Sequence, residues 1–172
     1  MTELLNLFAT SPKGLEGLLF EEIKSLGGSE TKETPGGVHF QADLTGAYRI
    51  CLWSRLANHV LLPLARFPAA DAEALYKGTQ GIDWETHFGI EQTFAVHFAS
   101  RNSALNHSQF GAQKVKDGIV DQFRERGGER PSVSLSNAEI HINCFIDRDQ
   151  ATVSLDLSGV SLHRRGYREQ AV

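Results

Sequence analysis

Apolar and polar residues alternate most regularly in the stretch IHINCFIDRDQATVSLDL, residues 140–157. Every second residue is apolar in residues 140–146, and again in residues 151–157. A period of two residues is typical of a strand that buries one face. The polar segment 147–149 between the two runs favours a tight turn. The stretch therefore predicts an antiparallel hairpin.

A long amphipathic helix is predicted upstream of the hairpin. Apolar side chains recur at helical spacing over about 18 residues, and the glycine pair 127–128 ends the helix. Its apolar face consists of Ala112, Val115, Ile119 and Phe123. Residues 93–100 alternate strictly and predict a further strand. A short helix near residues 72–77 is less clearly marked, and a second domain is expected to begin close to residue 66.

The first 65 residues predict three strands and two helices. The strands are residues 4–9, 38–42 and 60–64, with Pro63 suggesting an edge or an end of the last one. In the first helix, Ser11 is expected to be the cap and Pro12 the first residue. The second helix is expected over residues 44–58, with Leu44, Ala47, Tyr48, Cys51 and Leu52 on one face. This β-α-β-α-β order is compatible with a small ferredoxin-like unit.

The composition is that of an ordinary globular protein. The chain has 172 residues, of which 41% are hydrophobic, enough for one good-sized core or two small ones. Its formal net charge is -4. Residues 1–100 hold 7 Lys and Arg against 12 Asp and Glu, whereas residues 101–172 hold 10 against 9. This asymmetry indicates nucleic-acid binding only where the positive groups cluster in space.

Metal and membrane functions are not expected from the sequence. Cys51 and Cys144 form no CxxC pair, and none of the seven histidines pairs at HxH or HxxxH spacing. No apolar run approaches the roughly 20 residues of a membrane span, and no signal segment begins the chain. We therefore expect a cytoplasmic protein with buried thiols, no metal and no membrane partner.

Catalytic motifs are also missing. The chain has no GxxxxGK[ST] loop and no glycine-rich turn from a strand into a helix that could hold a nucleotide or S-adenosylmethionine. All five prolines are isolated, so the Pro-Pro turn typical of enzymes that methylate a base amino group is missing. We expect no catalytic residues, no bound cofactor and no enzyme activity from this chain alone.

Positive residues gather in two places. The long helix and its approaches carry Arg101, Lys114, Lys116, Arg124, Arg126 and Arg130. Acidic neighbours on the same helix leave a solvated surface with ordinary ion pairs as an alternative. The C-terminal segment is denser and carries His163, Arg164, Arg165, Tyr167 and Arg168. Guanidinium groups bind phosphate, and tyrosine stacks on a base or ribose, so this composition suits RNA. A basic interdomain linker is the alternative, and both can hold at once.

An ordered series of motifs resembles the N-terminal region of the bacterial 23S ribosomal RNA guanine-N2-methyltransferases. The motifs are LFAT (7–10) with GLE (14–16), GGVHF (36–40), WSRLA (53–57), NHSQFG (106–111) with KVKD (114–117), LDLSG (155–159) and LHRRGYR (162–168). The resemblance covers essentially the whole chain. It implies an α/β (α+β) fold with a ferredoxin-like segment, residues 1–65, and a THUMP domain, residues 66–168, with a mixed sheet and flanking helices. Residues 169–172 would then begin a linker to a methyltransferase domain.

The resemblance implies that the chain binds 23S ribosomal RNA and delivers a guanine to the methyltransferase domain of the same parent protein. That domain, and not this chain, is expected to hold S-adenosylmethionine. The eleven basic and aromatic residues named above are the candidate RNA contacts. The alternative is a domain-positioning or protein-interaction module with little RNA affinity of its own.

Overall fold

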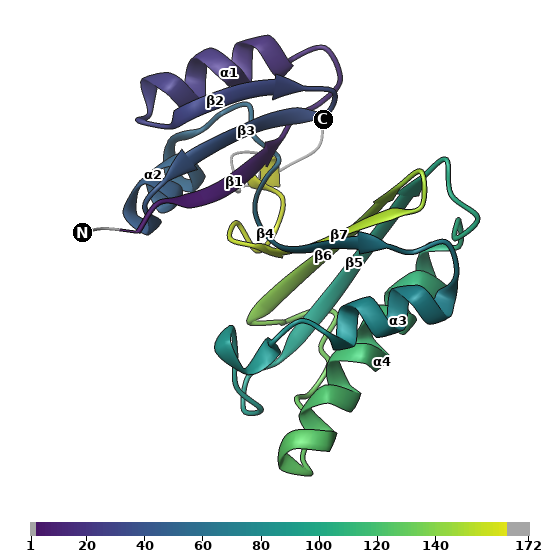
Figure 1. The fold of residues 1–172 in the computed structure, drawn as a ribbon. Coiled ribbons are helices and arrows are strands. Elements are labelled where there is room, and N and C mark those ends of the chain that lie inside the picture. The colour runs from purple at the N-terminus through teal and green to yellow at the C-terminus, as the bar shows by residue number, and fades with distance from the viewer. Residues whose placement is uncertain (1–2, 165–172) are drawn as a thin grey trace, which may run out of the picture. The chain divides into compact units, whose positions relative to one another are not determined.

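The computed structural model describes residues 3–164, which form two compact units. The first unit contains the chain up to Leu62 together with the segment from Asp156 onwards, and the second contains Pro63–Leu155. Each unit has a core of its own. The strands and helices are drawn in Figure 1. The α/β class predicted from the sequence is confirmed.

The first unit has a four-stranded antiparallel sheet in the order β2-β3-β1-β4. Its elements are β1 (Leu5–Thr10), α1 (Glu16–Ser25), β2 (Ser29–Thr34), β3 (Gly37–Ala42), α2 (Leu44–Trp53) and the first part of β4 (His59–Pro68). Leu7, Phe40 and Val60 from the sheet pack with Leu19 and Ile23 of α1 in the core. Strand β2 was not predicted, because its sequence SETKET is polar and its residues lie at the sheet's edge.

The start of the first helix differs from the prediction. Helix α1 begins at Glu16, and Ser11 does not cap it. The chain turns first at Gly14, whose φ of 88° suits glycine, and the Glu16 carboxylate accepts hydrogen bonds from the backbone N–H groups of Gly14 and Gly36. Among residues 3–164, the hydroxyl of Ser11 is the buried side-chain group with no hydrogen-bond partner.

The buried face of α2 is only partly the one predicted. Ala47 is fully buried and Cys51 packs against the first core, as predicted, whereas Leu44, Tyr48 and Leu52 are 50%, 53% and 66% exposed. Ile50, which was not predicted, is fully buried. The helix ends at Trp53 instead of continuing to residue 58. A backbone change to the extended conformation at Ser54 ends it. Only a narrow stripe of α2 therefore contacts the sheet.

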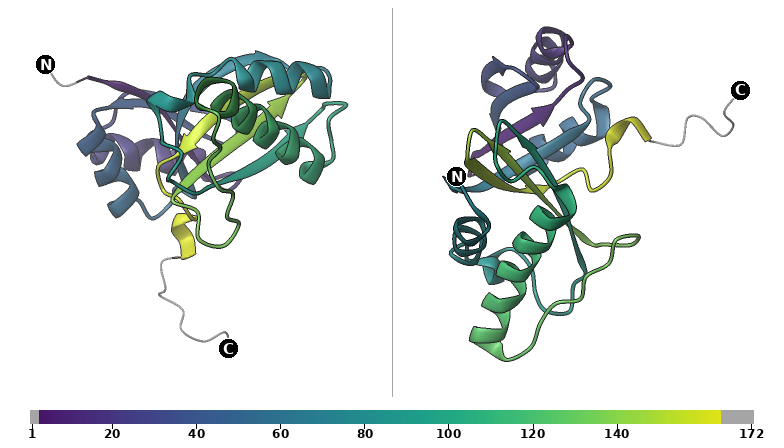
Figure 2. Two further views of the ribbon diagram at one scale, coloured as in Figure 1. Left: turned by 90° about the horizontal axis from the view of Figure 1, so that it is seen from below. Right: turned by 90° about the vertical axis from the view of Figure 1, so that its right-hand side faces the viewer.

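The second unit has a mixed sheet in the order β4-β7-β6-β5, to which β4 contributes its second part. Its other elements are α3 (Ala72–Gln80), the short 3-10 helix η1 (Trp84–Thr86), β5 (Phe94–Arg101), α4 (Ser108–Gly127), β6 (Ile140–Asp147) and β7 (Gln150–Asp156). β5 and β6 are parallel, and β6 and β7 form the predicted antiparallel hairpin. Arg148 and Asp149 make its turn with φ of 48° and 59°. Helices α3 and α4 cover one face of this sheet (Figures 1 and 2).

The predicted apolar face of the long helix is confirmed. Val115, Ile119 and Phe123 are buried against β5 and β6, and α4 ends at Gly128, whose φ is 75°. Trp84, which has no clear role in the sequence, is fully buried in the same core. No helix among residues 3–164 is both long and apolar enough to cross a bilayer.

The prediction of an edge or an end for Pro63 is only partly confirmed. Pro63 lies inside the ten-residue strand β4, which has neighbours on both sides. The pairing of β4 with β1, however, stops at Leu61. The missing N–H of Pro63 therefore falls where β1 no longer needs a donor, which is why the strand tolerates it.

The segment after β7 returns to the first unit. The backbone N–H of Leu157 donates to the carbonyl of Val60 at 2.9 Å, and that of Leu162 donates to the carbonyl of Asn58 at 2.8 Å. The side chains of Leu157 and Leu162 pack against the first core. The domain limits 1–65, 66–168 and 169–172 stay a prediction. By contacts, residues 156–164 belong with the first unit, because they pair with the start of β4.

Candidate nucleic-acid interface

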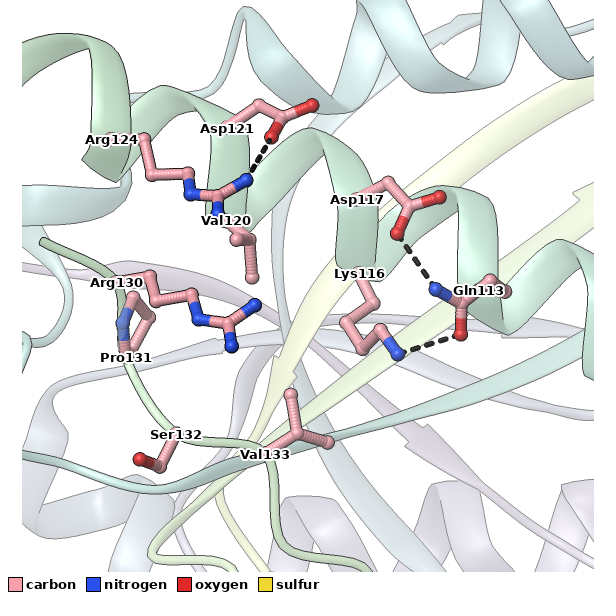
Figure 3. A pocket seen from close by; sticks show the side chains of 10 residues that line it. All are labelled: Gln113, Lys116, Asp117, Val120, Asp121, Arg124, Arg130, Pro131, Ser132 and Val133. Carbon is pink, nitrogen blue, oxygen red and sulfur yellow. Dashed lines mark hydrogen bonds and ion pairs between the residues drawn. The ribbon is translucent and has the colours of Figure 1, made fainter. Parts of the chain in front are cut away.

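A groove of about 440 Å³ lies between α4 and the segment that follows it (Figure 3). We call it the α4 groove. Its walls are formed by Gln113, Lys116, Asp117, Val120, Asp121, Arg124, Arg130, Pro131, Ser132 and Val133. All of these residues belong to the second unit. The groove is the natural place to test whether positive groups converge.

The groove forms because the chain turns back after α4. Gly128 takes the left-handed conformation that commonly ends helices, and the chain then runs beside β5. There the N–H of Phe94 donates to the carbonyl of Ser132, and the N–H of Ser134 donates to the carbonyl of Phe94, both at 3.0 Å. These bonds hold the segment 130–133 opposite the exposed side of α4.

Three of the predicted RNA contacts line the groove. Lys116 donates to the Gln113 side-chain oxygen at 2.6 Å, and the guanidinium of Arg124 lies 3.7 Å from an oxygen of Asp121. Arg130 extends toward the groove from the opposite wall (Figure 3). Its guanidinium has no ion-pair or hydrogen-bond partner among residues 3–164. Arg130 is therefore the cation most available to an anionic ligand.

Two carboxylates share the groove with these cations. Asp117 accepts a hydrogen bond from the Gln113 amide at 2.7 Å. Asp121 accepts one from the hydroxyl of Tyr76 on α3 at 2.9 Å, and this bond raises the pKa of Tyr76. Three cations and two carboxylates leave a small positive excess. Both carboxylates already accept hydrogen bonds from neighbouring side chains, so part of their charge is neutralised within the protein.

The other predicted cations on the second unit lie elsewhere. Arg101 forms a bidentate ion pair with Asp147 of β6. Its Nε donates to Oδ1 at 3.2 Å and its Nη2 donates to Oδ2 at 2.7 Å. Arg126 pairs with Asp83 and Glu85 beside η1. The ammonium of Lys114 lies 5.7 Å from the ring centre of Phe110. None of these three lines the groove, and two of them are already neutralised by carboxylates.

The C-terminal candidates are described in part. His163 and Arg164 are exposed on the short 3-10 helix η2 (Leu162–Arg164), which packs with the first unit. The Nδ1 atom of His163 lies 2.6 Å from the hydroxyl of Ser161. Arg165, Tyr167 and Arg168 lie outside the described residues.

Sequence reasoning missed one wall of the groove. Pro131, Ser132 and Val133 lie in a stretch without helical or strand periodicity. Only the contact of residues 132–134 with Phe94, about 40 residues earlier, places this segment beside α4. A local pattern carries no signal for such a contact.

The groove suits recognition better than catalysis. The groove is lined mainly by cations, hydrogen-bonded carboxylates and small apolar side chains. Its lining residues include no cysteine, no serine–histidine pair and no lone buried acid that could act as a nucleophile or base. Lysine and arginine side chains on two walls can hold phosphate oxygens, and Val120, Pro131 and Val133 can contact a sugar or a base. The arrangement fits a polyanion lying along α4.

Comparisons with known proteins identify the families that the two parts of the chain resemble. The family model described as THUMP domain matches residues 69–156, and the model described as RlmL ferredoxin-like domain matches residues 6–61. A "Ribosomal RNA large subunit methyltransferase K/L" from Methylococcus capsulatus is 58% identical over 166 residues, which are 96% of this chain and 22% of that protein. The protein of the same name from Syntrophotalea carbinolica is 53% identical over 168 residues, 98% of this chain and 24% of that protein.

Solved structures extend the likeness. A putative methyltransferase solved in complex with SAH shares 28% sequence identity with a TM-score of 0.83, covering 99% of this chain and 46% of that chain. The chain spans less than a quarter of the length of the two curated relatives above. The resemblance identified from the sequence motifs is confirmed by these matches.

Proposed function

The chain belongs to the THUMP-domain family, and from this premise we propose that it is the RNA-binding portion of a ribosomal RNA methyltransferase. It binds structured 23S ribosomal RNA and presents a guanine, whose N2 atom is methylated, to a catalytic domain of the same parent protein. Relatives named as large-subunit ribosomal RNA methyltransferases support this assignment. The same names support a place in the cytoplasm, where bacterial ribosomal RNA is assembled into ribosomal subunits.

The observation that carries the proposal is the convergence of Lys116, Arg124 and Arg130 on one groove. These side chains are the sequence candidates that the fold brings together. Contacts to phosphate and ribose fix the position of an RNA without reading its sequence. A methyltransferase that acts on a base amino group must flip that base out of its helix, which costs a few kcal/mol. Backbone contacts made by this chain would offset part of that cost.

S-adenosylmethionine is assigned by this proposal to the catalytic domain and supplies the methyl group there. One turn among the described residues can be compared with a cofactor loop. The β1–α1 turn brings Gly14 ahead of a helix, as a cofactor loop would, but its N–H donates to the carboxylate of Glu16. The same carboxylate also accepts from Gly36. This turn is therefore closed by the protein's own side chain, and we derive no catalytic step in this chain.

A salt titration tests the proposal. The 172-residue chain should bind a helical fragment of 23S RNA with an affinity that falls linearly with salt on a log–log scale, at a slope set by the number of phosphates neutralised. The double variant Arg124→Ala/Arg130→Ala should lower both the affinity and the slope. Lys77→Ala is the matched control, because Lys77 is an exposed cation on α3 that pairs with Glu73 outside the groove.

The competing role is a positioning or protein-interaction module with little RNA affinity. It predicts no salt-sensitive binding by the unaltered chain. That result would reject our proposal, and equal losses in the groove variant and in Lys77→Ala would reject the groove as the site.

A further inference from the structure

The second unit has another surface on the side of its sheet away from α3 and α4, which we call the outer face. It consists of His97 and Ala99 on β5, His141, Asn143 and Phe145 on β6, and Thr152 on β7. His97, Ala99 and Phe145 are exposed on it, whereas His141, Asn143 and Thr152 are partly buried and Ala95 and Ser154 are buried. These residues alternate with core residues such as Phe98, Cys144 and Val153, which face the helices. The α4 groove therefore does not include this surface.

Aromatic rings occupy two places on the outer face. The rings of His97 and His141 are stacked, with centroids 5.7 Å apart and an angle of 6° between their planes. Phe145 is 39% exposed, which is unusual for a phenylalanine in the middle of a strand. Its cross-strand neighbours are small, Ala99 on β5 and Thr152 on β7, so no large side chain flanks its ring from either strand.

The spacing of these rings is set by the strand. His141 and Phe145 are four residues apart on the same face of β6, which corresponds to about 13 Å. Asn143 lies between them and offers both a hydrogen-bond donor and an acceptor. Ring side chains on the face of a sheet are the platforms on which unpaired bases stack in single-strand-binding proteins.

Charge at one end of the outer face is complementary to a nucleic-acid backbone. Arg66, Arg101 and Arg148 gather around Asp147, whose pKa is lowered by its hydrogen bond with Arg101 and further by the charges of Arg148 and Arg66. Arg101 is paired with Asp147. Arg66 and Arg148 have no side-chain hydrogen-bond or ion-pair partner among residues 3–164. Asp149, beside Arg148 in the same turn, adds a second carboxylate, which accepts a hydrogen bond from the hydroxyl of Ser103. Three guanidiniums against two carboxylates leave a small positive excess at this end.

We propose that the outer face, centred on Phe145 and the His97–His141 pair, binds single-stranded RNA by stacking unpaired bases, with Arg66 and Arg148 holding the adjacent phosphates. A protein partner fits less well, because the face offers only one large apolar side chain, whereas the core of a protein–protein interface combines several. A helical RNA fits less well too, since its bases are turned inward. This inference goes beyond the proposed function, because it concerns a different surface and an unpaired ligand.

The test uses the 172-residue chain and an unpaired oligonucleotide of about ten residues that carries 2-aminopurine, whose fluorescence changes on stacking. Phe145→Ala should weaken binding about tenfold, as expected for the loss of one base–ring stack, and should remove most of the fluorescence change. The salt slope should stay the same, because no phosphate contact is lost. Phe145→Tyr should retain binding, because the ring remains.

Two further variants separate ring stacking from plain apolar contact and from a general effect of losing an exposed ring. Phe145→Leu keeps an apolar side chain but no ring, and should behave like Phe145→Ala. Phe110→Ala removes a phenylalanine of similar exposure, 46%, from α4 and should bind the oligonucleotide normally. Unchanged circular dichroism in all variants excludes unfolding as the cause.

The outcomes distinguish this inference from the groove proposal. Full binding by Phe145→Leu, or the absence of oligonucleotide binding by the unaltered chain, overturns the stacking surface. Loss of binding to the helical RNA fragment in the Arg124→Ala/Arg130→Ala variant, with normal oligonucleotide binding, supports both surfaces as separate sites. Oligonucleotide binding that depends on Phe145, without any binding of the helical fragment, supports the outer face and rejects the groove.

Discussion

Asp156 at the end of β7 accepts a hydrogen bond from the Nδ1 atom of His59 at the start of β4, at 2.6 Å and across 97 residues of sequence. The side chain of Asp156 is 2% exposed and that of His59 is 32% exposed. The same carboxylate accepts from the backbone N–H of Ser158 at 3.0 Å. This pair therefore joins the two parts of the chain that form the first unit.

Replacing the carboxylate of Asp156 should weaken the packing of residues 156–164 against the rest of the first unit. We expect Asp156→Ala to lower the free energy of unfolding by about 1–3 kcal/mol, because it removes the buried acceptor of two partly buried donors on His59 and Ser158. Urea denaturation followed by circular dichroism measures this change. Asp71→Asn is the control, since Asp71 is an exposed helix cap that asparagine replaces well, and it should change stability by less than about 0.5 kcal/mol. Equal stability of Asp156→Ala and the unaltered chain would contradict the structural role.

Gln122 should be important for the second core. Its side-chain oxygen accepts from the N–H of Trp84 at 3.0 Å, and its amide donates to the carbonyls of Gln80 and Ile82. Gln122→Leu keeps the volume but leaves three buried backbone groups without a partner, so we expect a loss of about 2–4 kcal/mol in unfolding free energy. Gln113→Leu on the exposed side of α4 should cost far less. Similar losses in both variants would show that burial of the polar group is not the cause.

Two glycines of α4 should respond in opposite ways to alanine. A Cβ atom at Gly111 would lie 2.5 Å from the ring of Phe98, whereas nothing lies within 4 Å of one at Gly127. Gly111→Ala should lower the melting temperature, with a cost of about 1–3 kcal/mol from the displaced ring. Gly127→Ala should be neutral or raise stability by up to about 1 kcal/mol, because alanine favours the helix. Calorimetry of the two variants decides this, and stabilisation by Gly111→Ala would contradict the packing described.

The thiol of Cys144 should report on the opening of the second core. Burial raises the pKa of Cys144 to about 12, so at pH 8 its thiol stays protonated and should not react with Ellman's reagent in the native protein. Since the thiolate is the nucleophile, reaction at Cys144 requires the second core to open. Its rate in the variant Cys51→Ser, followed against urea, should rise with unfolding of that core. Rapid reaction in native buffer would show that Cys144 is accessible.

The predicted cations should differ in their effect on RNA binding. Arg126 is paired with Asp83 and Glu85, whereas Arg130 has no such partner among the described residues. Under the proposed function, Arg130→Ala should reduce the salt slope by about 1, as for the loss of one phosphate contact, and Arg126→Ala should leave it nearly unchanged. Filter binding at several salt concentrations measures both slopes. A larger effect from Arg126→Ala would place the RNA along η1 instead of the groove.

Sequence periodicity predicted the elements whose buried face is strongly apolar. The 140–157 hairpin and helix α4 follow directly from apolar residues repeated every two positions and at helical spacing. Strand β2 could not be predicted in this way, because an edge strand with SETKET buries no apolar face. The predicted face of α2 was wrong at Leu44, Tyr48 and Leu52, because the helix carries more apolar residues than pack in the first core.

The candidate site depends on contacts that a sequence pattern does not encode. Charge identified Lys116, Arg124 and Arg130, but it gave equal weight to Arg101 and Arg126, whose carboxylate partners lie on other elements. The wall formed by residues 130–133 arises from backbone pairing with Phe94. Which of several similar cations is left without a carboxylate partner therefore depends on tertiary structure.

The return of residues 156–164 to the first unit also fixes an order of assembly during synthesis. The second unit is a continuous stretch that is complete at Leu155, whereas the first unit receives its last segment only after that point. A ribosome thus finishes the later unit before the earlier one. The first unit therefore lacks its last segment, and His59 lacks its partner Asp156, until the whole inserted unit has been made.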